Sequence, residues 1–147
     1  MKSHIRMMAV AVLAALASLP MIASAQTTVL YARVKVPFVF NYGTQRMPAG
    51  TYVVTLTDSG LLTVSGSPVT AMAIARVSYE PARVSASQAV FNQYGHRYFL
   101  EGLTIDGSGA EVSVPTSETE QLYSREWAMN RQVPSQRTLA LLTQPPR

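Results

Sequence analysis

The chain contains no cysteine, and its 147 residues include only two histidines, His4 and His96. Without thiols it has no disulfide, catalytic cysteine, cysteine-bound metal or cysteine-linked lipid. A domain of this composition has no disulfide and must rely on core packing for its stability. Long apolar runs are also absent after residue 25, so we expect no membrane-spanning helix in the rest of the chain.

The first 25 residues carry the pattern of a secretory signal peptide. Lys2 and Arg6 form a short basic head, and residues 7–25 contain no charge. The apolar run ends in Ala23-Ser24-Ala25, small residues of the kind that signal peptidase accepts. We therefore expect cleavage before Gln26 and a periplasmic or secreted mature protein. The alternative is an uncleaved membrane anchor, which the small residues before the cut disfavour.

Cleavage would leave 122 of the 147 residues, enough for one domain with a core and too few for two ordinary ones. It also removes Lys2 and Arg6, so ten of the 12 basic residues remain against eight acidic ones, a net charge of +2. These basic residues are scattered singly, whereas proteins that bind the phosphate backbone show a clustered stripe. The composition therefore argues against a nucleic-acid partner.

Alternating apolar and polar residues predict strand after strand in the mature chain. Pro37 interrupts the first run and predicts that this strand either bends there or lies at a sheet edge with that side facing solvent. The 69–77 run has apolar residues at both odd and even positions, which predicts a central strand covered on both sides. Turn residues separate the runs, as in Asp58-Ser59-Gly60 and Gly95-His96. Gly102 predicts a bulge. The expected strands cover residues 30–40, 51–57, 61–65, 69–77, 88–94, 97–105 and 110–114.

About seven short strands with turns between neighbours predict a mainly β fold, a small antiparallel β-barrel or a two-layer sandwich, with the barrel slightly preferred. Ser117 and Glu120 have the spacing of a capping box and predict a C-terminal helix over residues 118–132. The domain thus covers residues 26–132, and the remaining residues, 133–147, are expected to form a flexible tail.

The predicted helix offers apolar side chains at Leu122, Tyr123, Trp127 and Met129. We expect this side to pack across a barrel mouth or a sheet face. The alternative is a helix that binds a partner with Trp127 as its anchor.

Three short motifs resemble one family. They are Val-Pro-Phe-Val-Phe at 36–40, Pro-Ala-Gly-Thr-Tyr at 48–52 and Tyr-Phe-Leu at 98–100. The chain resembles a group of small uncharacterised secreted β-rich proteins, mostly from soil bacteria, with a Val-Pro-Phe-x-Phe strand, a Pro-Ala-Gly-x-Tyr turn and a late aromatic strand pair. Val39 stands where relatives often have an acidic residue. The resemblance implies an envelope or secreted protein and supplies no activity.

No catalytic, cofactor or metal site emerges from the residue pattern. His96 is expected to be a solvent-facing turn residue, and one histidine does not make a usual zinc site. Asp106-Gly107-Ser108-Gly109 lacks the distal Glu of a calcium loop. Paired carboxylates for glycoside hydrolysis would have to come from the helix acids or from Glu80, Glu101 and Glu111, whose convergence the sequence does not show. The prediction is a protein that is not an enzyme.

Aromatic side chains are the more suggestive feature, and most are expected to fill the core. If some of them line an open barrel instead, the protein could carry a small apolar ligand. We favour a non-catalytic module that contacts a protein or an envelope surface. A membrane β-barrel is a third possibility, disfavoured by the short strands. The residues proposed for either the core or a ligand site are Phe38, Phe40, Tyr52, Phe99, Leu100 and Trp127.

Overall fold

The computed structural model of the chain describes residues 27–79, 86–106 and 109–144. The predicted signal peptide over residues 1–25 lies outside these ranges, as do Glu80 and the centre of the turn after Asp106. Among the described residues, no helix has the length and hydropathy needed to cross a bilayer.

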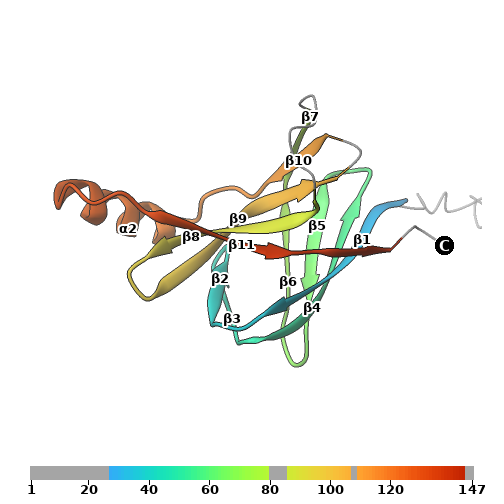
Figure 1. The fold of residues 1–147 in the computed structure, drawn as a ribbon, viewed down its shortest axis with the longest axis horizontal. Coiled ribbons are helices and arrows are strands. Elements are labelled where there is room, and N and C mark those ends of the chain that lie inside the picture. The colour runs from blue at the N-terminus through green and yellow to red at the C-terminus, as the bar shows by residue number, and fades with distance from the viewer. Residues whose placement is uncertain (1–26, 80–85, 107–108, 145–147) are drawn as a thin grey trace, which may run out of the picture.

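The described part of the protein is mainly β and consists of two sheets with one helix near the C-terminus (Figure 1). The mainly β fold class predicted from the sequence is therefore confirmed. The described residues form twelve strands where about seven were expected. Two of the predicted runs are each divided in two, and three further strands form outside the predicted runs, at residues 45–47, 135–140 and 142–144. The strands of the described residues form no closed barrel, so the sandwich describes the fold and the slight preference for a barrel was wrong.

The first sheet has five antiparallel strands, in the order β12-β1-β4-β5-β6. Its central pair joins Val34 to Tyr52, and the next hairpin joins Leu56 to Leu62 across a tight turn. Gly60 has φ +82° in that turn, a conformation that favours glycine. The strands are β1 Thr28–Val36, β4 Gly50–Thr57, β5 Leu61–Ser65, β6 Thr70–Ile74 and β12 Leu142–Gln144.

The second sheet runs in the order β11-β8-β9-β10-β7, and a short hairpin, β2-β3, joins it beside β9. The β2 contact is a parallel pairing between Asn41 and Phe99. The strands are β2 Phe40–Tyr42, β3 Gln45–Met47, β7 Arg76–Tyr79, β8 Gln88–Tyr94, β9 Arg97–Ile105, β10 Ala110–Ser113 and β11 Ser135–Ala140.

The two sheets are joined at both edges by chain segments that leave one sheet and enter the other. The segment β6-β7 changes sheets at Ala75, and β11-β12 changes sheets at Leu141. Both corner residues are buried, and their backbone amides donate hydrogen bonds, Ala75 to Gly60 and Leu141 to Ser87. The corners therefore hold the sandwich closed without leaving these backbone donors unsatisfied.

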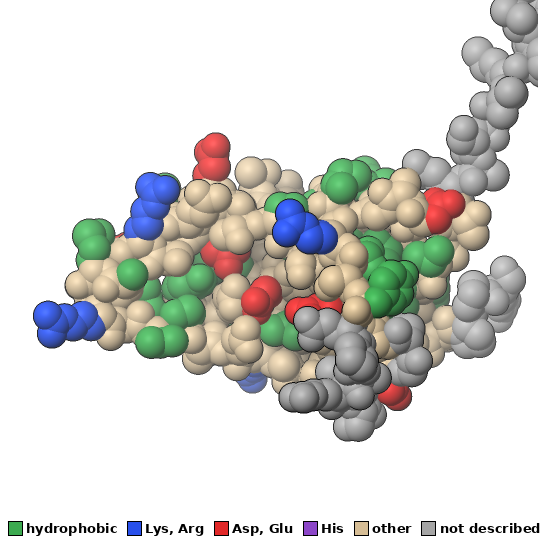
Figure 2. Space-filling model, turned by 90° about the horizontal axis from the view of Figure 1, so that it is seen from above, with side chains coloured by type: hydrophobic (Ala, Val, Ile, Leu, Met, Phe, Trp, Pro, Cys, Tyr) green, Lys and Arg blue, Asp and Glu red, His purple; other side chains and the backbone are tan. Residues whose placement is uncertain are grey.

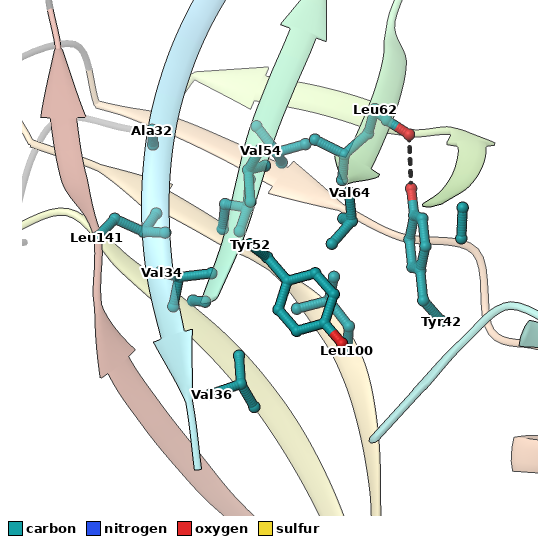
Figure 3. Close-up of a cluster of buried hydrophobic side chains, with 14 of the residues drawn as sticks. Ala32, Val34, Val36, Tyr42, Tyr52, Val54, Leu62, Val64, Leu100 and Leu141 are labelled. Atoms are coloured by element: carbon teal, nitrogen blue, oxygen red, sulfur yellow. Dashed lines mark hydrogen bonds between the residues drawn. The ribbon is translucent and has the colours of Figure 1, made fainter. Parts of the chain in front are cut away.

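Inward-facing residues of both sheets form one core (Figure 3). Phe40 is fully buried in this core, with its ring centroid 5.3 Å from those of Tyr52 and Phe91, in edge-to-face contact. The hydroxyl of Tyr42 donates a hydrogen bond of 2.8 Å to the carbonyl of Leu62. Burial raises the pKa of Tyr42 to about 12, so this phenol remains a donor at neutral pH.

The predicted bend at Pro37 is confirmed, since β1 ends at Val36. Two other expectations were wrong. The 69–77 run is a sheet-switching edge segment and not a central strand, and it leaves Met72 and Ile74 exposed. Within the tail expected to be flexible over 133–147, residues 135–140 and 142–144 instead form β11 and β12, which pair with β8 and β1, while residues 145–147 lie outside the described ranges.

Helix α2 spans Glu118–Met129, three residues shorter than predicted at its C-terminal end. The Ser117 hydroxyl accepts a hydrogen bond of 3.2 Å from the Glu120 amide, which confirms the predicted N-cap. Arg131 ends the helix with φ +54°, and the Gln132 amide donates to the carbonyl of Trp127. This closing pattern is a Schellman motif, which stops the helix before Pro134.

Candidate functional site

A shallow pocket of about 220 Å³ lies on the outer face of the second sheet. Its floor is Gly102, where a bulge sets the β8-β9 register, so that Val90 pairs with Gly102 and Phe91 pairs with Leu100. The bulge predicted at Gly102 is therefore confirmed. A Cβ at Gly102 would lie 2.3 Å from the Val112 carbonyl oxygen, so only glycine fits this close strand approach.

The pocket walls combine apolar side chains of the sheet with polar and acidic ones. Glu101 and Glu111 line it from neighbouring strands, and the Gln136 side chain donates a hydrogen bond of 2.8 Å to the Glu101 carboxylate. Thr104 also lines the pocket, and its Oγ1 is buried with no hydrogen-bond partner in the described part of the chain. Figure 2 shows acidic side chains in the middle of the face that it displays.

Glu120 of α2 is the only buried charged residue in the described ranges, with 5% of its surface exposed. Its carboxyl accepts a hydrogen bond of 3.0 Å from the Asn92 side chain on β8. Burial raises the pKa of Glu120, the Asn92 hydrogen bond lowers it, and the nearby charge of Glu101 raises it further. The predicted capping box is thus only half formed, because the Glu120 carboxyl bonds to β8.

Aromatic side chains attach α2 to the β8-β9 hairpin. Trp127 lies edge-on to Tyr94, with ring centroids 6.1 Å apart, and Tyr123 contacts Phe99 at 5.9 Å. The Arg97 guanidinium lies 4.6 Å from the centroid of the Tyr123 ring. This confirms that the helix packs on a sheet face. Trp127 is half-buried in that contact, so it is not a free anchor for a partner.

The aromatic residues singled out from the sequence do not converge on one cavity. Phe40 and Tyr52 are buried in the core, and so is Leu100. Phe99 on β9 lies under α2, whereas Trp127 belongs to α2 and faces Tyr94 of the β8-β9 hairpin. Phe38 is half-buried at the margin of the core, in edge-to-face contact with Phe91 at 5.3 Å and stacked on Tyr98 at 4.0 Å. The Arg137 guanidinium lies 5.0 Å from its ring centroid.

Of the polar candidates, His96 is exposed in the β8-β9 turn, as expected. The structure does bring Glu101 and Glu111 to one pocket, a convergence that the sequence could not establish. No group of three or more potential metal ligands occurs within the residues described. What the pocket offers chemically is a set of hydrogen-bond acceptors and carboxylates suited to hydroxyl or cationic groups.

Sequence reasoning missed two features. Gln136 reaches the pocket from a segment predicted to be a tail, although three leucines and two threonines between Thr138 and Thr143 could have indicated a strand there. The second missed feature is the exposure of large apolar side chains on the outward side of α2 and just after the helix. Leu122, Met129 and Val133 are 64%, 78% and 87% exposed. Apolar side chains gather at the helix end of the molecule in Figure 2.

Comparison with protein-family models, with curated proteins and with solved structures finds no match for the chain.

Proposed function

We propose that the mature protein is an exported, non-catalytic module of the envelope or the medium that acts through contacts with a protein or a surface. The observation that carries the proposal is the outward side of α2, where the large apolar side chains of Leu122 and Met129 are 64% and 78% exposed. They lie two helical turns apart on the same side of the helix, with Arg125 between them, so a partner would contact a mixed apolar and charged line along α2. The N-terminal export pattern supports a role outside the cytoplasm.

The shape of α2 also supports a contact role. The helix lies at one end of the long axis and projects beyond the two sheets (Figure 1). Only Glu120 is buried among its 12 residues. A partner could therefore reach the outward side without displacing the sandwich.

The alternative is a carrier of a small apolar ligand, and the core gives it less support. Such a carrier needs apolar side chains around an open space. Phe40 is instead packed edge-to-face on both Tyr52 and Phe91, with its ring centroid 5.3 Å from each of theirs. The pocket over Gly102 is outside the core and is lined by carboxylates.

Native mass spectrometry of the mature protein, purified gently from the host's periplasm, medium and envelope fractions, tests the proposal. We expect a complex with protein, or retention on the envelope fraction. Replacing Leu122→Asp and Met129→Asp together should abolish it, while Thr119→Asp, an exposed change on the same helix with no basic residue three or four positions after it, should not. A bare monomer in every fraction would contradict the proposal, and a monomer with an apolar molecule bound would establish the carrier.

A further inference from the structure

Charged and apolar residues alternate along the outward side of α2. Glu118, Leu122, Arg125 and Met129 follow one another at intervals of four, three and four residues, so they form one line along the helix. All four side chains are exposed. We call this line the α2 stripe.

The two charged members of the α2 stripe have no opposite charge at helical spacing. Positions three and four residues after Glu118 hold Gln121 and Leu122. Arg125 has these same two residues before it and Ala128 and Met129 after it. Since side chains pair along a helix at these two spacings, neither charge is neutralised by its own helix.

The order of the α2 stripe is self-complementary when the helix is reversed. Glu118 lies about 6 Å before Leu122 along the helix axis, and Arg125 lies about 4.5 Å after it. A second, antiparallel helix facing the first about Leu122 would therefore bring Glu118 of each helix to within about 1.5 Å of the axial level of the other's Arg125. A parallel arrangement would instead put each charge against its own kind.

We propose that the α2 stripe docks on the α2 stripe of a second copy of this chain, antiparallel, with Leu122 close to the two-fold axis. The interface is isologous, so the Glu118-Arg125 pair forms twice. The two Leu122 side chains contact each other, and Met129 covers the exposed Pro115 that precedes the partner helix. This inference rests on the proposed function and specifies its partner.

The opposite side of α2 already packs on the β8-β9 hairpin through Tyr123 and Trp127, so docking requires no rearrangement of the fold. A pair of 12-residue helices buries less than the standard interface area of about 1,600 Å². We therefore expect a weak dimer that dissociates on dilution. Its ion pairs are exposed, so added salt should weaken it further.

Analytical ultracentrifugation of the mature chain at low salt, over a range of concentrations, tests the inference. Glu118→Arg and Arg125→Glu should each weaken self-association by at least about tenfold, since each places like charges together twice. The double variant E118R/R125E restores opposite charges and should return to within about threefold of the wild type. Arg131→Glu, the same change of charge as Arg125→Glu but off the stripe, should leave association unchanged. Circular dichroism checks that every variant keeps its helix.

A wild-type chain that stays monomeric up to about 1 mM would overturn the inference, as would a double variant as weak as the singles. Either result would leave the proposed function standing if the host fractions yield a complex with a different protein. The proposed function fails only when those fractions yield no protein or surface partner at all.

Discussion

The Asn92 side chain on β8 donates a hydrogen bond of 3.0 Å to the buried carboxyl of Glu120 on α2. This contact ties the helix to the sheet next to the aromatic contacts of Tyr123 and Trp127. It also means that a titrating group lies inside the helix-sheet junction, so the stability of the junction depends on pH.

Stability should fall as pH rises through the range in which Glu120 ionises. Burial raises the pKa of Glu120 in the folded chain, so the unfolded chain releases this proton first as pH rises. At pH values below the usual pKa of a glutamate, Glu120 is protonated in both the folded and the unfolded chain, so its burial does not lower the stability. We expect Glu120→Gln to be more stable than the wild type near pH 7 and the difference to shrink toward pH 4, as measured by urea unfolding. Exposed Glu118→Gln is the control, and a difference that is constant with pH would refute the assignment.

Gly102 should tolerate no larger residue. A Cβ added at this position would lie 2.3 Å from the Val112 carbonyl oxygen. Val112 belongs to a strand paired with β9, so its backbone has little freedom to move away. We expect Gly102→Ala to destabilise the protein by about 3 kcal/mol in chemical denaturation. Gly50→Ala is a matched control, because its Cβ would meet only Tyr52 Cε2 at 3.8 Å and should change stability by less than about 1 kcal/mol. Equal effects at the two glycines would show that the strand approach at Gly102 is not close.

The core and the helix junction should respond differently to loss of an aromatic ring. Phe40 is 1% exposed and contacts two other rings, so Phe40→Ala should cost about 3 to 5 kcal/mol. Trp127 is half-buried at the end of the molecule, so Trp127→Ala should cost about 1 kcal/mol and leave the sandwich folded. Urea unfolding followed by circular dichroism measures both. Similar losses for the two variants would mean that α2 and the sandwich share one core.

The mature chain should begin at Gln26. The small residues at Ala23 and Ala25 suit the signal-peptidase pocket, so intact-mass measurement of the exported protein should show loss of residues 1–25. Ala25→Arg, which puts a long charged side chain next to the cut, should cause unprocessed precursor to accumulate. Gln26→Ala, on the other side of the bond, serves as the control and should be processed normally. An exported protein that retains Met1 would contradict the signal-peptide prediction.

Local patterns were enough to predict the elements whose signals are local. Residues 88–94 and 97–105 were predicted with the bounds of β8 and β9, because alternation and the Gly95-His96 turn depend only on neighbours in the chain. The N-cap at Ser117 was predictable for the same reason. The mainly β class followed from the number of such runs.

The site depended on long-range contacts. Tyr123 and Trp127 turn toward the β8-β9 hairpin, while Leu122 and Met129 turn away, a division that the shared apolar character of the four residues hides. Leu122 and Trp127 are five residues apart, about 140° around the helix, so one packed side cannot hold both. Which of the two would be buried was decided by the position of the hairpin.

The sequence by itself determined the export pattern, the run of strands and turns, the helix start and the absence of thiol chemistry, because each depends on residue type and short-range spacing. Only the tertiary structure decided that β6-β7 and β11-β12 change sheets and that Gln136 meets Glu101 over Gly102. Gln136 and Glu101 are 35 positions apart in the chain and meet because strands from distant parts of the chain pair in one sheet. The short-range spacing of residues does not indicate which distant strands will pair.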